Sequence, residues 1–280
     1  MKYLIIALTL ILLAQFAFGQ EAFKVEKSGK GTPVVYLPGF TTPGNVWDET
    51  IKNVKGTHEN HVFTYAGFDG VAPIGTPWYE PLKDQIIDYI KEQKLTNMTV
   101  IGHSMGGNLA IDIAAALPDQ ITNLILIESI PCMREVMMPG VPASALTYDS
   151  PYNQQMINMS DEAFLQTATQ MAQNMTNRED KMEVIKNYIL NSDRETYVYG
   201  YTDLLKLDLR DKLSELKTKN LILGASFPTK EMVLTTYESQ YQNLKNKEIF
   251  IAEDSKHFIM FDQPEWMYGK INEFLEKEIQ

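Results

Sequence analysis

A serine lies between two glycines in the segment from Gly102 to Gly106, "GHSMG", which fits the pattern Gly-x-Ser-x-Gly. The apolar run "TVI" precedes this segment, and "NLAIDIAAALP", with helical character, follows it. A serine on a tight turn between a strand and a helix is typical of a nucleophile elbow, where side chains at the glycine positions would clash. The pattern therefore predicts that Ser104 is a nucleophile for acyl transfer. The alternative is a glycine-rich turn that holds an incidental serine.

A nucleophilic serine needs a base, and the chain has four histidines, His58, His61, His103 and His257. His257 follows the apolar segment "EIFIAE" by a short loop, which places it at the carboxyl edge of a sheet, where the serine is also expected. His103 is inside the elbow and is expected to point away from the serine. His58 and His61 flank the start of another strand, at the opposite edge, without the carboxylates or cysteines of a metal site. We therefore predict His257 as the base, with a surface histidine as the alternative.

The elements that must position these residues are short apolar strands that alternate with amphipathic helices. Strands are expected at Pro33–Leu37, at His61–Ala66 and in "NMTVIG", "NLILIE", "NLILG" and "EIFIAE". The segment "FKVEKSGKGTPVVYLPG" is predicted to form a hairpin that turns near Gly29. Helices are expected in "PLKDQIIDYIKEQ", from the elbow to Pro118, and behind Pro264. Apolar strands separated by helices predict an α/β fold, with a mostly parallel sheet covered on both faces.

The region from Pro131 to Leu209 interrupts this alternation. It shows no clear strand, and two segments in it, "DEAFLQTATQMAQNM" and "KMEVIKNYIL", have helical patterns. We predict a helical lid over residues 131–209, inserted between two parts of the core at residues 20–130 and 210–280. The insertion holds 8 of the 14 methionines of the chain. These flexible side chains suit an apolar substrate pocket, or they pack the insertion onto the core.

The first 19 residues have the pattern of a secretory signal peptide. Lys2 precedes an apolar run from Tyr3 to Leu13, and small residues follow at Ala17 and Gly19. We therefore predict cleavage after Gly19 and a secreted or periplasmic protein without a stable membrane anchor. The alternative, an uncleaved anchor, is less favoured because the apolar run is short for a bilayer span.

The composition limits the partners of the chain. The net charge is −11, and it becomes −12 once Lys2 is removed with the leader. Such an acidic chain is not expected to bind nucleic acid or anionic lipid. Cys132 is the only cysteine of the sequence, so no intramolecular disulfide can form, and we predict a buried, unreactive thiol. Serine chemistry of this kind implies neither a metal ion nor an organic cofactor.

Three segments, "YLPGF", "GHSMGG" and "AEDSKHFIMFDQPEW", resemble the α/β-hydrolase superfamily, in particular its small secreted, lidded serine hydrolases. The resemblance implies a doubly wound sheet with an inserted lid, and the chain order serine, acid, histidine. It also implies an oxyanion hole formed by the N–H groups of Met105 and Phe40. Many members have His-Gly where this chain has Pro38-Gly39, so a side chain that often braces the loop is missing. The serine argues against dehalogenase and epoxide hydrolase chemistry, which uses an aspartate on this fold.

The acid that this family uses is absent from its usual place. In the pattern Gly-x-x-Asp after the strand "NLILG", the aspartate would fall at Phe227. Glu128 ends the preceding strand, 24 residues after Ser104, and some families of this fold place the acid there. All parallel strands end at one edge, so Glu128 can reach the histidine from the other side. We predict Glu128 as the acid, and Glu231, late in the loop, and Asp254 are the alternatives.

These residues predict a serine hydrolase that cleaves carboxylic esters with a Ser-His-Glu triad through an acyl-enzyme. The expected substrate is a small-molecule ester or amide with an apolar acyl part. A proline-releasing aminopeptidase is one alternative, and it would need lid carboxylates to hold an amine. The candidates for that role are Glu162, Glu179, Asp180 and Glu183. A non-catalytic binding protein on this fold is a second alternative, kept open by Phe227.

Overall fold

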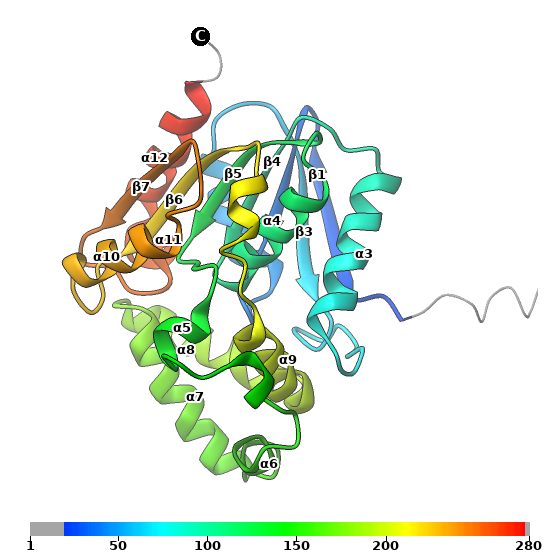
Figure 1. Cartoon of the computed structure of the whole chain (residues 1–280), viewed down its shortest axis with the longest axis vertical. Coiled ribbons are helices and arrows are strands. Elements are labelled where there is room, and N and C mark those ends of the chain that lie inside the picture. Colours follow the sequence, from blue (N-terminus) through cyan, green and yellow to red (C-terminus); the bar gives the residue numbers. More distant parts are fainter. Residues whose placement is uncertain (1–19, 278–280) are drawn as a thin grey trace, which may run out of the picture.

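The computed structural model describes residues 20–277, so the predicted signal peptide lies outside the described part of the chain. Its centre is a seven-stranded sheet with the order β1-β3-β2-β4-β5-β6-β7 (Figure 1). The strands are β1 (Phe23–Gly29), β2 (Thr32–Leu37), β3 (His58–Tyr65), β4 (Met98–His103), β5 (Ile121–Ile127), β6 (Lys219–Ala225) and β7 (Lys247–Ala252). Only β1 is antiparallel to its neighbour. The predicted α/β class with a mostly parallel sheet is confirmed.

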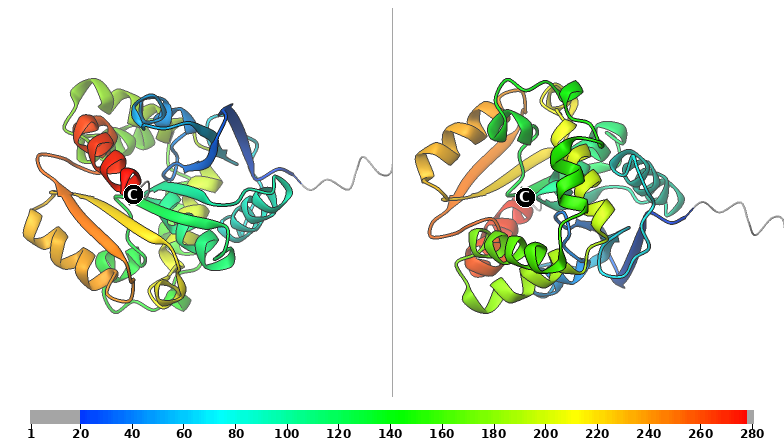
Figure 2. Two further views of the ribbon diagram at one scale, coloured as in Figure 1. Left: turned by 90° about the horizontal axis from the view of Figure 1, so that it is seen from above. Right: turned by 90° about the horizontal axis from the view of Figure 1, so that it is seen from below.

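Helices cover both faces of the sheet (Figure 2). One face packs against α3 (Tyr79–Glu92), α4 (Met105–Ala116), η3 (Lys212–Glu215) and α10 (Lys230–Gln240). The other packs against η1 (Gly44–Trp47), α2 (Asp48–Asn53), α11 (Ile259–Asp262) and α12 (Pro264–Glu276). Consecutive strand residues such as Val34 and Val35 belong to opposite apolar clusters, as expected for a sheet that is buried on both sides.

The predicted hairpin at the N-terminus is wrong. β1 and β2 are consecutive, but β1 pairs with β3, from Phe23 opposite Tyr65 to Gly29 opposite Glu59. β2 lies between β3 and β4 and is parallel to both, so neither of its edges is free for β1. β1, with its polar sequence "KVEKSG", instead forms an outer edge of the sheet, where charged side chains can remain in solvent.

Residues 131–209 contain helices and no strand, as predicted. The helices are α5 (Met133–Met137), η2 (Ala143–Ala145), α6 (Pro151–Ile157), α7 (Asp161–Met175), α8 (Glu179–Leu190) and α9 (Arg194–Lys206). Together they lie beyond the carboxyl ends of the parallel strands (Figures 1 and 2). No helix within residues 20–277 is both long and apolar enough to cross a membrane.

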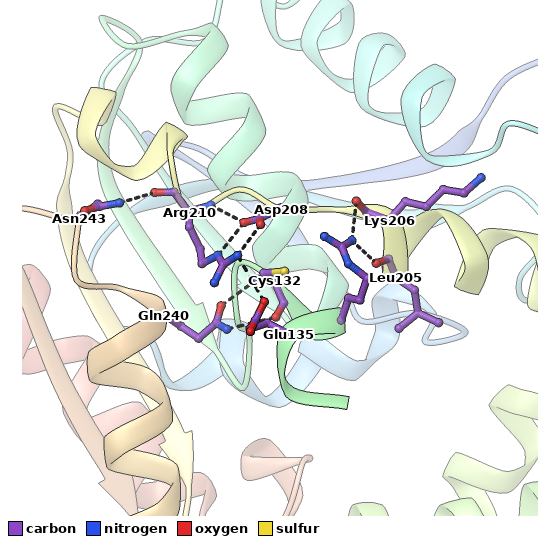
Figure 3. Close-up of polar contacts among 9 residues, drawn as sticks. Cys132, Glu135, Leu205, Lys206, Asp208, Arg210, Gln240 and Asn243 are labelled. Carbon is purple, nitrogen blue, oxygen red and sulfur yellow. Dashed lines mark hydrogen bonds and ion pairs between the residues drawn. The ribbon is translucent and has the colours of Figure 1, made fainter. Parts of the chain in front are cut away.

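The two ends of the insertion are tied to each other and to the core (Figure 3). Arg134, at the start of the insertion, donates from Nη1 to the carbonyl oxygens of Leu205 (2.8 Å) and Lys206 (3.0 Å) at its end. Gln240 of α10 accepts from the Cys132 N–H (3.0 Å) and donates to the Cys132 carbonyl (3.2 Å). Cys132 is buried, as predicted, and burial raises the pKa of its thiol, which disfavours the reactive thiolate.

A buried carboxylate on α9 joins the insertion to α3. Asp203 accepts hydrogen bonds from the backbone N–H groups of Trp78 (2.8 Å) and Tyr79 (3.2 Å), at the start of α3. These N–H groups have no partner within their own helix, and the carboxylate also favours the positive end of the helix dipole. The Tyr148 hydroxyl donates to the second oxygen of Asp203. The insertion is therefore packed on the core by polar as well as apolar contacts.

Candidate active site

Ser104 lies on a strained turn between β4 and α4. Its backbone angles, φ 54° and ψ −123°, are unfavourable for a residue with a side chain. The turn also requires the two glycines, because a Cβ at Gly102 would lie 2.4 Å from the Gly106 carbonyl oxygen. A Cβ at Gly106 would lie 2.1 Å from the Leu37 carbonyl oxygen. The geometry has the features of a nucleophile elbow, which holds the serine side chain above the sheet edge.

Two backbone N–H groups beside the serine are free to bind an anion. Met105 is the first residue of α4, so its N–H has no partner within the helix. Phe40 lies in the turn after β2, and its N–H makes no hydrogen bond within residues 20–277. Both residues line cavities that include Ser104. The structure thus leaves both predicted oxyanion donors available.

The loop that carries Phe40 is braced by aromatic side chains. The Phe40 ring packs edge-on against Phe68 and Trp78, with centroid distances of 5.0 and 5.7 Å. It also lies 6.0 Å from the Tyr197 ring of α9. The Tyr65 hydroxyl donates to the Pro38 carbonyl oxygen (3.1 Å). An aromatic cluster from core and insertion therefore fixes this loop.

His257 and Glu128 lie in hydrogen-bond contact at the carboxyl edge of the sheet. His257 Nδ1 is 3.1 Å from Glu128 Oε2, although 129 positions separate the two residues. Glu128 directly follows β5 and has a positive φ of 48°, which turns the chain at the strand end. Its side chain is only 16% exposed, so solvent screens the pair weakly. The structure brings together the two residues that the sequence proposes as base and acid.

The second carboxylate oxygen of Glu128 is held by two donors that the sequence analysis missed. Glu128 Oε1 accepts from the Ala225 N–H at 2.6 Å and from the Tyr237 hydroxyl at 3.0 Å. Burial, followed by the negative charge of Glu128, raises the pKa of Tyr237 well above the usual tyrosine value. Tyr237 therefore stays protonated and acts as a donor. Ala225 and Tyr237 fix the carboxylate so that Oε2 faces His257.

Neither alternative acid makes a side-chain hydrogen bond or ion pair with His257 in the described residues. Glu231 is exposed in the first turn of α10 and not in a loop, so its predicted position in an irregular segment is wrong. Thr229 is the N-cap of this helix, and its hydroxyl accepts from the Met232 N–H (3.3 Å). Threonine is a preferred N-cap residue, so the sequence itself indicated a helix start here. Asp254 is exposed as well, and Phe227 is 54% exposed at the end of β6. Glu128 is the carboxylate that contacts His257.

The loop that carries His257 is fastened to the insertion. The Phe258 N–H donates to the Met175 carbonyl oxygen at the end of α7 (2.9 Å). Asp262 accepts from the N–H of Asn177, between α7 and α8, at 2.9 Å, and from the N–H of Lys256 at 2.8 Å. Movement of α7 away from the core would break these bonds, so the C-terminal end of α7 helps to position the histidine.

His103 holds the backbone of His257 through a hydrogen bond. Its Nε2 is 2.9 Å from the His257 carbonyl oxygen, and because a carbonyl only accepts, Nε2 carries the proton. The two rings lie 4.7 Å apart, and a Cβ at Gly39 would approach His103 Nδ1 to 2.9 Å. Burial, with the neighbouring His257, holds the pKa of His103 well below the usual value, so the ring is neutral. His103 and Ser104 both line the same cavity.

Two cavities meet at Ser104 and His257. The inner cavity, of about 290 Å³, is lined largely by apolar side chains of α7, α8 and α9 and by Phe40. The outer cavity, of about 410 Å³, lies at the ends of β5 and β6 and reaches α10. Met133 and Leu204 line both cavities. No Asp, Glu, Lys or Arg lines the inner cavity, and Glu128 is the single such residue of the outer cavity.

Some methionines of the insertion line a cavity, and others pack on the core. Met171 and Met175 line the inner cavity, as does Met133. Met156 and Met182 pack in the apolar cluster on one face of the sheet. Within residues 20–277, no group of three or more His, Cys, Asp or Glu side chains is placed to hold a metal ion.

Comparison with known proteins agrees with this geometry. Residues 34–269 match the alpha/beta hydrolase family. The chain belongs to this family. Among solved structures, the esterase EaEST from Exiguobacterium antarcticum superposes with a TM-score of 0.75 over 91% of this chain and 98% of that one, at 19% identity. A bromoperoxidase from Bacillus anthracis gives a TM-score of 0.74 over 91% and 95% of the two chains, at 16% identity. At such identities the likeness shows the fold alone.

Curated relatives are also similar at low identity. The pimeloyl-[acyl-carrier protein] methyl ester esterase of Vibrio vulnificus is 22% identical over 256 residues, which cover 90% of this chain and 97% of that protein. The enzyme of the same name from Aliivibrio salmonicida is 23% identical over 195 residues, 68% of this alpha/beta hydrolase and 72% of the relative.

Proposed function

We propose that this alpha/beta hydrolase is a serine esterase that cleaves carboxylic esters through an acyl-enzyme. The observation that carries the proposal is the His257–Glu128 contact of 3.1 Å at the strand edge that also holds the strained Ser104 turn. The relatives named as methyl ester esterases support an ester substrate.

The contacts suggest a role for each group. His257 Nδ1 donates to Glu128, which leaves Nε2 to take the proton of Ser104 as its oxygen attacks the carbonyl carbon. His257 then returns this proton to the leaving alcohol, and a water molecule repeats the sequence to release the acid. The N–H groups of Met105 and Phe40 bind the oxyanion, and losing one such donor typically costs roughly 3 kcal/mol.

The residues that line the site favour an ester substrate over a peptide with a free α-amine. An aminopeptidase would need carboxylates to hold the free amine of its substrate. Glu162, Glu179, Asp180 and Glu183 line neither cavity at Ser104. Asp180 instead pairs with Arg178 at 2.8 Å. The apolar lining supports a small-molecule ester with an apolar acyl part.

Labelling with a fluorophosphonate probe tests this proposal, because the probe reacts with an activated serine. Wild-type protein should be labelled, and Ser104→Ala should keep its fold by circular dichroism but lose both labelling and turnover of p-nitrophenyl esters. Hydrolysis of aminoacyl-naphthylamides, measured in parallel, should be far slower than that of the esters. Equal labelling of Ser104→Ala would place the nucleophile elsewhere, and faster cleavage of the amides would favour an aminopeptidase.

We also propose that the protein acts outside the cytoplasm. The support is the signal-peptide pattern of residues 1–19, which lie outside the described part of the structure. N-terminal sequencing of the native protein should find Gln20 as the first residue. An N-terminus that retains the leader would contradict cleavage.

A further inference from the structure

Large apolar side chains gather on the surface at the end of β6. Six such side chains are exposed within residues 20–277, and three of them, Val136, Phe227 and Met232, line the outer cavity. Their exposed fractions are 47%, 54% and 60%. Single exposed apolar residues are common on proteins, but a group around one opening marks a binding surface.

This apolar rim is continuous with the active site. The cavity that the rim lines also contains Ser104 and His257. Glu128, its single carboxylate, is already bound to His257, Ala225 and Tyr237. Groups that remain free for a ligand are therefore mainly apolar. A chain of methylene groups fits these walls. A cation close to the rim is Lys256, whose ammonium lies 5.7 Å from the Phe227 ring centroid and already donates to the carbonyl oxygens of Gln173 and Thr176.

The inner cavity explains why a second subsite is needed. A carbonyl carbon bonded to Ser104 carries two substituents, the acyl chain and the alkoxy group, which point away from each other. The inner cavity can hold one of them, under α7, α8 and α9. The outer cavity includes the same serine, shares Met133 and Leu204 with the inner one, and reaches the apolar rim.

We propose that the outer cavity and its rim of Val136, Phe227 and Met232 form a subsite for a second apolar chain of the ester. This inference rests on the proposed esterase function and narrows its substrate class to esters with an apolar chain on each side of the carboxyl group. Phe227, at the position where the family's usual acid would fall, is then a specificity residue. The occupant is a chain of the substrate, either its acyl or its alcohol part.

Two substrate series distinguish these parts. In one, methyl esters carry acyl chains from acetate to octanoate, and in the other, acetate esters carry alcohols from methanol to octanol. In the series whose chain enters the outer cavity, kcat/KM of the wild type should rise by about fourfold for each methylene that is buried. The double variant Phe227→Ser with Met232→Ser should lower the ratio of kcat/KM for the longest chain to kcat/KM for the shortest chain in that series by about tenfold.

A control variant removes another exposed apolar side chain, one that lines neither cavity. Leu165 on α7 is 42% exposed and lines neither cavity, so Leu165→Ser should keep the wild-type ratio in both series. If the double variant had the same long-chain to short-chain ratio of kcat/KM as Leu165→Ser, the proposed subsite would be wrong. All variants remove exposed side chains, and circular dichroism should show the wild-type fold.

Further outcomes distinguish a substrate chain from other occupants of the rim, and distinguish failure of the subsite from failure of the esterase proposal. A loss that appears only above the critical micelle concentration of the ester would assign the rim to a lipid surface and overturn the inference. A change from dimer to monomer in the double variant, by light scattering, would assign the rim to a second copy of the chain and also overturn it. Fluorophosphonate labelling of the double variant should persist. If the wild type neither hydrolysed esters nor reacted with the probe, the proposed function itself would be contradicted.

Discussion

The carboxyl ends of β5 and β6 lie side by side in the sheet, and they carry opposite kinds of side chain. β5 ends at Glu128, a carboxylate that is 16% exposed and accepts three hydrogen bonds. β6 leads to Phe227, an apolar ring that is 54% exposed and lines the outer cavity. Ile127, the last residue of β5, is paired in register with Leu223, two residues before the end of β6, so both ends reach the same edge.

In the proposed triad the acid follows β5, and β6 supplies one of the hydrogen-bond donors that hold it. The Ala225 N–H, at the end of β6, donates to Glu128, and so does Tyr237 of the helix that follows β6. A carboxylate that is held by two donors and faces an imidazole can stabilise the imidazolium from either strand end. With the acid on β5, the end of β6 is free to carry an apolar side chain.

Glu128→Gln should have the largest effect on this comparison. The amide keeps the size of the carboxylate but loses its charge and can favour the wrong tautomer of His257. We expect kcat for p-nitrophenyl acetate to fall about 10⁴-fold, or roughly 5 kcal/mol. Stopped-flow and steady-state rates would measure this loss.

Two variants serve as controls for that loss. Glu231 and Asp254 are both exposed and make no side-chain contact with His257, so Glu231→Gln and Asp254→Asn should remain near the wild-type rate. If either control lost activity while Glu128→Gln kept it, the acid would not be Glu128.

A carboxylate at the end of β6 should partly replace the lost one. Phe227→Asp in the Glu128→Gln background places a carboxylate where the family pattern has its acid, beside the cavity that contains His257. Phe227 is half-exposed, so the change does not bury a charge or leave a void in the core. We expect kcat for the short acetate ester to recover about a hundredfold of the lost activity. Phe227→Asn in the same background is the control, and equal recovery by the amide would show that charge is not the cause.

Tyr237→Phe should have a smaller effect, because the Ala225 N–H still holds Glu128. Loss of one hydrogen bond to a charged group costs about 1.5–3 kcal/mol, and we expect about a tenfold fall in kcat as the carboxylate becomes less well oriented. The raised pKa of Tyr237 keeps its hydroxyl protonated, so the ratio of wild-type to variant rates should stay constant from about pH 7 to about pH 9. A ratio that falls toward the alkaline end would mean that Tyr237 ionises in the wild type.

The sequence predicts the fold and the principal site residues because they depend on local patterns. The strand-turn-helix pattern indicates Ser104, and the carboxyl ends of two apolar strands, β5 and β7, indicate Glu128 and His257. Tyr237 could not be found in this way, because it is 109 positions from Glu128 and no pattern in α10 marks a residue that faces the site. The pairing of β1 with β3 is likewise set by competition for strand edges, which a local hairpin pattern does not contain.

His103, at the end of β4, extends the comparison to a third strand end. The effect expected there is the smallest, and it is on stability. His103 is fully buried and neutral, with a pKa held well below its usual value by burial and by His257. In the unfolded chain the ring takes up a proton below about pH 6.5, whereas in the folded protein it does not. The free energy of unfolding therefore falls as the pH drops below that value, by up to about 1.4 kcal/mol per pH unit for one such group.

His103→Gln should reduce this acid sensitivity. Glutamine can donate to the His257 carbonyl oxygen in place of His103 Nε2, so the contact at 2.9 Å can persist without a titrating ring. The variant should lose less stability between about pH 7 and about pH 5 than the wild type, by roughly 1–2 kcal/mol in urea unfolding. Some pH dependence should remain, because burial also lowers the pKa of His61. If the two proteins lost equal stability over this range, His103 would take up its proton equally well in the folded chain, and its ring would not be held neutral beneath His257.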